Sequence, residues 1–152
     1  MKKFNIVLFE PEIPQNTGNI ARLCACTGAS LYLVGKLGFS LSSKYTKRAG
    51  LDYWDSVDIQ KADSLEQLQS QHENATFYYL TTKSEKSFFD VQFKEGDFLV
   101  FGPETRGLPE EILNKNKETS IKIPMLENQR SLNLSNSVSI VLYEAIRQGL
   151  PK

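Results

Sequence analysis

One arginine stands out in the stretch PQNTGNIARLC, residues 14–24. Arg22 is the only charged side chain between Ile20 and Gly28, whereas a helix facing water carries several charges. A guanidinium stays protonated in proteins, so Arg22 is a poor candidate for a proton acceptor. It can instead stabilise a developing negative charge or hold a phosphate with two parallel hydrogen bonds. The simpler alternative is a structural ion pair with Glu104.

Two asparagines, Asn16 and Asn19, precede this arginine. Their amides offer hydrogen bonds close to a predicted helix start, where Asn16 or Thr17 is expected to be the N-cap. We interpret both asparagines as groups that support neighbouring loops.

A second cluster is FGPETRGLP, residues 101–109, which follows a predicted buried strand. Gly102 is expected to let a ligand approach the backbone, and Pro103 fixes one backbone angle. Glu104 is the only carboxylate before the next proline, and we expect it to support this loop or the asparagines rather than transfer a proton. Gly107 completes the dense run of special residues. The alternative is a plain, tight connection between a strand and a helix.

A third cluster lies within IPMLENQRSLNLSNSVSIVLYEA, residues 123–145. Ser131, Asn133, Ser135 and Asn136 gather at the predicted N-terminus of the most apolar helix, where backbone N–H groups also converge. One such residue would serve as a cap, but four indicate a polar site. An elaborate cap is the alternative.

These clusters need a scaffold that brings them together, and the apolar patterning predicts one. Strands with little alternation are separated by helical segments, which favours an α/β fold with a mostly parallel sheet flanked by helices. Ligands bind beyond the carboxyl ends of such strands, so the loops after Thr82, Phe101 and Pro124 are the expected site. We predict strands at 4–10, 30–35, 76–82, 97–102 and 120–125, and helices at 16–27, 64–71, 109–116 and 133–148.

Composition excludes several classes of protein. The 152 residues fit one domain over 1–152, and no run of about 20 apolar residues predicts a membrane span. Cys24 and Cys26 are expected to be core residues in a reducing cytoplasm, and His72 a surface residue, so no metal site is predicted. The 18 basic and 18 acidic residues balance, so nucleic-acid binding would need local basic patches. Signatures of phosphate loops, dinucleotide sites and nucleophile elbows are missing from the sequence.

Taken together, NTGNIAR, FGPETRGLP and the stretch from Ile123 to Ala145 resemble the three motifs of the SPOUT superfamily. They are most similar to those of the SpoU-like RNA ribose 2′-O-methyltransferases, and the likeness covers nearly the whole chain. The resemblance implies an α/β domain with a C-terminal trefoil knot, a homodimer, and S-adenosylmethionine bound in the knotted loops. It also implies tRNA as the substrate, without a metal and without an extra RNA-binding domain.

The resemblance assigns roles by position. The cofactor contacts fall on Leu80, Gly102, Ile123 and Ser131. Arg22 matches the motif-one arginine and Asn133 the motif-three asparagine, so with Ser131 these are the expected catalytic residues. Tyr143 falls where enzymes acting on the wobble position place a tyrosine implicated in tRNA binding.

The implied reaction is methylation of the 2′-hydroxyl of nucleotide 34, a cytidine or modified uridine, in leucine tRNAs. The further RNA contacts are predicted from charge alone at Lys44, Lys47 and Arg48, at Lys83 and Lys86, and at Arg130. Two alternatives stay open at this stage. One is methylation of another tRNA or rRNA site, and the other is an RNA-binding factor without activity.

Overall fold

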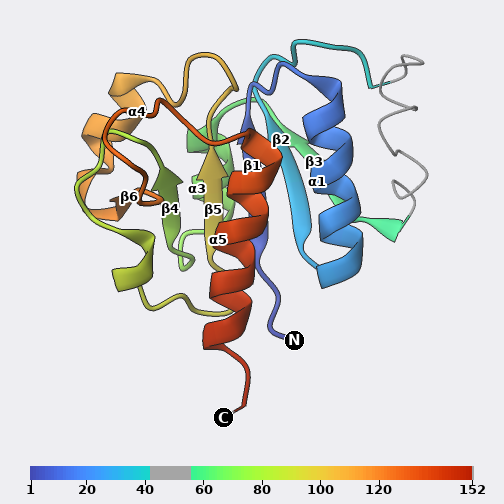
Figure 1. The fold of residues 1–152 in the computed structure, drawn as a ribbon. Coiled ribbons are helices and arrows are strands. Elements are labelled where there is room, and N and C mark those ends of the chain that lie inside the picture. Colours follow the sequence, from blue (N-terminus) through green and yellow to red (C-terminus); the bar gives the residue numbers. More distant parts are fainter. Residues whose placement is uncertain (42–55, 152) are drawn as a thin grey trace.

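A parallel sheet forms the centre of the computed structural model, which describes residues 1–41 and 56–151 (Figure 1). Within these residues the sheet has six strands in the order β3-β2-β1-β5-β4-β6, and every neighbouring pair is parallel. The predicted mostly parallel α/β fold is therefore confirmed. The strands are β1 (Asn5–Phe9), β2 (Ser30–Val34), β3 (Ile59–Ala62), β4 (Phe77–Leu80), β5 (Phe98–Phe101) and β6 (Ser120–Ile121).

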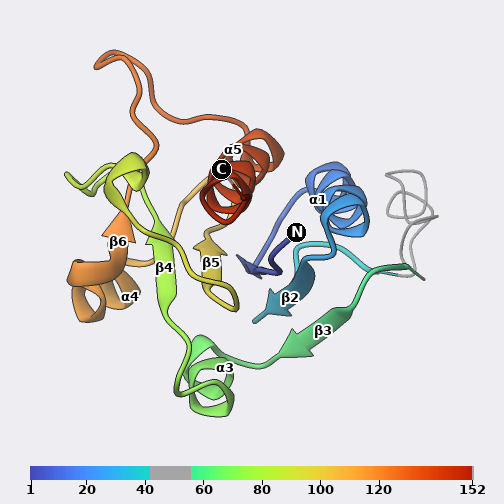
Figure 2. The same cartoon turned by 90° about the horizontal axis from the view of Figure 1, so that it is seen from below.

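Helices cover both faces of this sheet (Figure 2). Helices α1 (Pro14–Thr27) and α5 (Leu134–Gln148) share a core with one face, and α3 (Leu65–Gln71) and α4 (Glu110–Lys115) share a core with the other. Short 3-10 helices occupy Phe88–Asp90 and Lys117–Thr119. Because all strands run the same way, their carboxyl ends meet at one edge, where the loops lie that the sequence singled out.

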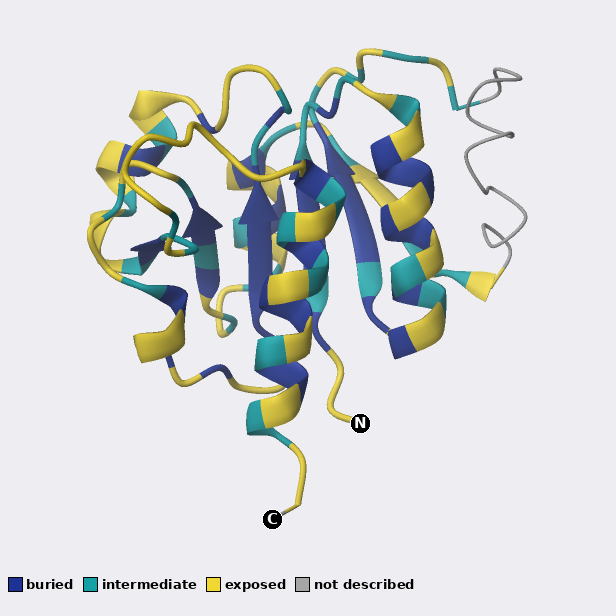
Figure 3. Ribbon diagram, viewed as in Figure 1, coloured by how far each residue is buried: buried dark blue, intermediate teal, exposed yellow. Residues whose placement is uncertain are grey.

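Two-sided coverage explains why the central strands are apolar without alternation. Ile6 and Leu8 of β1 point into the core with α1 and α5, while Val7 between them points into the core with α3 and α4. Each is at most 1% exposed, and burial of such a side chain contributes about 1.5–3 kcal/mol. Figure 3 shows these strands almost fully buried, and the outer faces of α1 and α5 striped with exposed residues.

Helix α1 begins two residues earlier than predicted. Its N-cap is Ile13, which makes no side-chain cap, and Pro14 occupies the first turn. Asn16 and Thr17 lie inside the helix and are buried, so their predicted capping role is wrong. The helix ends as predicted at Gly28, whose φ of 73° is left-handed and whose N–H donates to the Cys24 carbonyl. Cys24 is buried as expected, but Cys26 is exposed on the outer face.

Helix α5 starts where a polar cap was expected. Asn133 is the N-cap, and its side chain accepts a hydrogen bond from the Asn136 N–H. Its buried stripe includes Val138, Val141 and Leu142, each 0% exposed. Ile140, also apolar, is 39% exposed, so the apolar residues of this helix are not all buried.

Two strand predictions needed correction. The chain leaves the sheet after Ile121, so β6 has two residues rather than six, although an isolated bridge pairs Lys122 with Ser87. Strand β3 was missed because the edge sequence IQKA is polar and only half-buried. His72 was also predicted wrongly, since its ring packs 4.8 Å from that of Phe98 and is half-buried.

The segment between β6 and α5 returns from the sheet edge to the middle of the sheet (Figure 2). Helix α5 packs there against α1 and β5. The trefoil knot implied by the family resemblance stays a prediction. In the described part of the chain, no helix combines the length and apolar character needed to cross a bilayer.

Candidate active site

A cavity of about 560 Å³ opens at the carboxyl edge of the sheet. Its walls come from three segments that follow β4, β5 and β6, as expected for a parallel sheet. The four residues that the resemblance assigns to the cofactor, Leu80, Gly102, Ile123 and Ser131, all line it. The cavity size falls within the range of about 300–1,000 Å³ that is typical for small-molecule sites.

The loop after β5 has a tight internal fold that depends on Gly102. A Cβ atom at this position would lie 2.3 Å from the Leu108 nitrogen and 2.4 Å from the Gly107 carbonyl carbon. We expected Gly102 to be glycine so that a ligand can approach, but the loop's own backbone already requires it. Gly107 is glycine for another reason, because its φ of 69° is left-handed, whereas a Cβ atom added there would have no neighbour within 4 Å.

Glu104 joins this loop to the start of α1. One carboxylate oxygen accepts the Glu12 N–H at 2.8 Å, and the other accepts the Ile13 N–H at 2.8 Å and the Asn16 side-chain amide at 3.1 Å. These N–H groups precede or begin the helix, where a negative charge is favourable. The alternative ion pair between Glu104 and Arg22 is not among the ion pairs of residues 1–41 and 56–151.

Asn16 extends the connection to the third motif. Its side-chain oxygen accepts a hydrogen bond of 3.2 Å from the Asn133 amide, and the Asn133 oxygen accepts from Ser135 and from the Asn136 N–H. The chain of contacts from Glu104 through Asn16 to Asn133 thus joins three motifs that are distant in sequence. We call this hydrogen-bonded group of Glu104, Asn16 and Asn133 the frame of the site. The predicted catalytic role of Asn133 stays a prediction.

The structure separates Asn19 and Arg22 from that frame. Both are exposed on α1, and neither is among the described residues that line the cavity. We expected Asn19 to support a loop in the same way as Asn16, but among the described residues only Asn16 makes such contacts. Arg22 lies on the helix whose N-terminus Glu104 holds, which fixes the position of its backbone relative to the cavity.

The predicted RNA contacts are dispersed. Lys83 and Arg130 line the cavity, and Lys83 pairs with Glu110 at 3.5 Å. Lys86 lines a neighbouring hollow of about 600 Å³. Tyr143 is 50% exposed on the outer face of α5. The predictions at Lys44, Lys47 and Arg48 lie outside the described residues.

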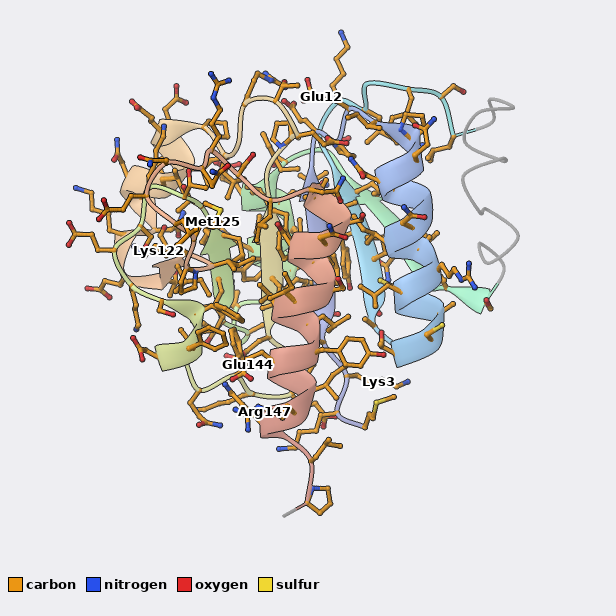
Figure 4. All side chains as sticks on the ribbon, viewed as in Figure 1. Lys3, Glu12, Lys122, Met125, Glu144 and Arg147 are labelled. Atoms are coloured by element: carbon orange, nitrogen blue, oxygen red, sulfur yellow. The ribbon has the colours of Figure 1, made fainter. Side chains whose placement is uncertain are left out.

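Our sequence reasoning missed an acidic pair that directly follows β1. Glu12 accepts hydrogen bonds from the Thr105 N–H at 2.9 Å and the Thr105 hydroxyl at 2.8 Å, and these bonds hold its pKa below the ordinary value. Arg106 lies 3.8 Å from Glu10 and 3.9 Å from Glu12. Figure 4 shows Glu12 at the loop edge of the sheet. The signal available in the sequence was that Glu10 and Glu12 lie at or just beyond the carboxyl end of a predicted strand, where site residues are expected.

The cavity combines features that suit a cofactor with apolar and charged parts. Leu80, Ile123 and Leu134 supply apolar surface, while polar and charged residues of the loops after β4 and β5 also line it. Among the described residues, no group of three or more histidine, cysteine or acidic side chains is placed to hold a metal ion.

The comparisons with known proteins agree with this geometry. A family model described as the SpoU rRNA methylase family matches residues 3–143. The chain belongs to this family. A relative from Methylovorus glucosotrophus (strain SIP3-4), named tRNA (cytidine(34)-2′-O)-methyltransferase, is 52% identical over 146 residues, which cover 95% of either chain.

One solved structure supports the same membership, and a second shares the fold. One, described as giving structural insights into the 2-OH methylation of C/U34 on tRNA, matches this SpoU family member with a TM-score of 0.91 and 47% identity. The match covers 97% of this chain and 96% of that one. The SpoU methyltransferase AviRb from Streptomyces viridochromogenes, solved in complex with the cofactor AdoMet, has a TM-score of 0.86 at 23% identity and shares the fold. That match covers 98% of this chain and 62% of AviRb.

The two loop glycines of this SpoU family member should respond differently to substitution. Gly102→Ala places a methyl group within 2.4 Å of backbone atoms and should lower the free energy of unfolding by about 1–3 kcal/mol or more. A Cβ atom at Gly107 would have no neighbour within 4 Å, and asparagine tolerates left-handed φ, so Gly107→Asn should cost about 1 kcal/mol or less. Urea unfolding of both variants measures the difference, and equal losses would contradict the steric explanation.

Proposed function

We propose that this protein transfers a methyl group from S-adenosylmethionine to the ribose 2′-hydroxyl of the tRNA wobble nucleotide, position 34. The observation that carries the proposal is the cavity lined by Leu80, Gly102, Ile123 and Ser131, the four positions expected to hold the cofactor. The name of the Methylovorus relative and the topic of the structure with 47% identity support the substrate. The nucleotide would be a cytidine or modified uridine, and leucine tRNAs are our proposed substrates.

The chain's own residues would bind the cofactor and hold it in one orientation. Leu80 and Ile123 offer an apolar slot for an adenine ring, and the backbone beside Gly102 offers hydrogen bonds. When bound, S-adenosylmethionine supplies a methyl group already activated by the positive sulfonium. The remaining task of the protein is alignment, and correct positioning of two reactants lowers a barrier by roughly 7–11 kcal/mol. Ser131, at the cavity wall, would orient the reacting groups.

Arg22 would activate the ribose hydroxyl by its fixed charge. Because guanidinium groups stay protonated in proteins, an arginine is not suited to serve as the base. It can lower the free energy of the alkoxide that develops as the hydroxyl attacks, and the proton would leave to a phosphate oxygen or to water. Because Arg22 is exposed, a large polymeric substrate can reach it. Asn133 would act from the frame, by holding Asn16 and the N-terminus of α5.

RNA binding would rest on local basic groups, because the chain carries no net charge. Arg130 at the cavity, with Lys44, Lys47 and Arg48, would contact phosphates, and Tyr143 would contact the anticodon region. Such phosphate contacts weaken steeply as salt rises. The protein would act as one methyltransferase domain in the cytoplasm, where its tRNA substrate is found.

The first prediction of this proposed function concerns the product. With purified tRNAs and S-adenosylmethionine, the protein should add one methyl group to the ribose of nucleotide 34, and digestion followed by nucleoside mapping should locate it. A methyl group at another tRNA or rRNA position would support the first alternative. Binding of tRNA without any methyl transfer would support the RNA-binding factor and contradict the proposal.

The second prediction concerns Arg22. Arg22→Lys keeps a positive charge but removes the planar, bidentate geometry, so we expect kcat to fall roughly tenfold to hundredfold. The pH–rate profile of the unmodified protein should show no step that could be assigned to an arginine acting as the base. Arg147→Lys is the matched control, because Arg147 lies at the far end of α5 and pairs with Glu144 (Figure 4). Near-full activity of the Arg22→Lys variant would contradict the bidentate role.

The third prediction concerns assembly. We propose a homodimer, which is supported by Ile140, an apolar side chain on the outer face of α5 that is 39% exposed in the single chain. Sedimentation equilibrium should give twice the mass of one chain, and Ile140→Asp should shift the protein toward the monomer. Leu150→Asp, a change at an exposed leucine beyond α5, should leave the mass unchanged. A single-chain mass for the unmodified protein would contradict the proposal.

A further inference from the structure

At the carboxyl edge of the sheet, each of two loops contributes a carboxylate that accepts hydrogen bonds from the other loop. Glu104 in the loop after β5 accepts backbone N–H groups of Glu12 and Ile13, and Glu12 in the loop after β1 accepts the backbone N–H and hydroxyl of Thr105. Each loop thus satisfies donors of the other. We call this reciprocal arrangement of Glu12, Glu104 and Thr105 the loop clasp.

Arg106 adds a second layer to the loop clasp. Its guanidinium lies between Glu10 and Glu12, at 3.8 and 3.9 Å, and is 63% exposed. Glu10 is the only described residue other than glycine with a positive φ, at 48°. Such a conformation is unfavourable in itself and persists where the surroundings hold it. In this conformation the Glu10 carboxylate lies against both the Arg106 guanidinium and the Lys36 N–H.

The clasped side of the loop is also a wall of the cavity. Thr105 and Arg106 both line it, whereas Glu10 and Glu12 do not. Between the end of β5 at Phe101 and the start of α4 at Glu110, the chain forms neither helix nor strand. Its conformation therefore depends on the internal closure at Gly102 and on the loop clasp.

We infer that Glu12 is a positioning residue for the cofactor, and that it acts by holding Thr105 and Arg106 in the conformation that shapes the cavity. This inference rests on the proposed function, since it concerns how S-adenosylmethionine is held. Glu12 itself does not touch the cavity, so it contributes no contact to the ligand. It reduces the number of conformations that the loop must give up when the ligand binds.

A purely structural role would have a different signature. Glu12 is 30% exposed and its partner Arg106 is more exposed still. Ion pairs at such a surface contribute little to folding. Loss of the clasp should therefore change the affinity for the ligand while the melting temperature of the ligand-free protein stays nearly constant.

Calorimetric titration with S-adenosylhomocysteine, the demethylated product, tests the inference. Glu12→Gln keeps the shape of the side chain and removes its charge, and we expect Kd to rise about threefold to tenfold. Thr105→Val removes the hydroxyl donor on the other side, and we expect a smaller rise. If both act through the same contact, the double variant should lose less affinity than the product of the two single effects.

Glu95→Gln is the matched control. Glu95 also accepts a backbone N–H, that of Lys3 at 3.0 Å, but neither residue lines the cavity. Its Kd should equal that of the unmodified protein. In methyl-transfer assays, Glu12→Gln should raise the KM for the cofactor in parallel with Kd and leave kcat at saturating cofactor within about twofold.

The outcomes separate this inference from the proposed function. If the unmodified protein does not bind S-adenosylhomocysteine, the proposed function fails and this inference fails with it. If it binds, and Glu12→Gln binds equally well, only the inference is overturned. A large fall in the melting temperature of ligand-free Glu12→Gln, with unchanged Kd for the folded fraction, would also overturn it, because the contact would then serve folding alone.

Discussion

The arrangement of this site depends on one carboxylate, that of Glu104. It accepts three N–H groups within 3.1 Å, two from the backbone before α1 and one from Asn16. A charged acceptor makes stronger hydrogen bonds than a neutral one, and leaving these donors without a partner would cost about 1–3 kcal/mol for each buried group. Through Asn16 the same carboxylate reaches Asn133 and so the N-terminus of α5. The cofactor loop, the helix that carries Arg22 and the third motif are thereby joined.

This connection is possible because of the strand order. Strands β1 and β5 are neighbours although the 88 residues from 10 to 97 lie between the end of one and the start of the other. Their carboxyl ends lie side by side, so the loop after one strand can hold the loop after the other. Glycine then sets how tightly the second loop folds, since the backbone at Gly107 and Leu108 occupies the space that a Gly102 side chain would need. The shape of this loop is therefore set mainly by backbone packing, which few side-chain types in the sequence indicate.

This explains how far the sequence could be used for prediction. Local signals were reliable in two places, since Gly28 ends α1 in a left-handed conformation and Asn133 caps α5, although neither Asn16 nor Thr17 caps α1 as predicted. Features that depend on distant partners were not. Glu12 and Glu10 look like ordinary surface acids until the strand order places them beside Thr105 and Arg106. Strand β3 is polar at the sheet edge, so its pairing with β2, and not its composition, makes it a strand.

The exposure of Arg22 adds a last constraint on the proposed chemistry. In water a charge acts weakly, since two unit charges 4 Å apart interact by about 1 kcal/mol, against about 4 kcal/mol at the lower effective dielectric near a protein surface. An exposed guanidinium therefore stabilises an alkoxide poorly until something excludes water from it. The substrate RNA itself would cover Arg22, so the full effect of the charge would arise only in the complex. Under the proposed function, this dependence favours transfer to the bound ribose over transfer to water, because a water molecule that enters the open site meets a screened charge.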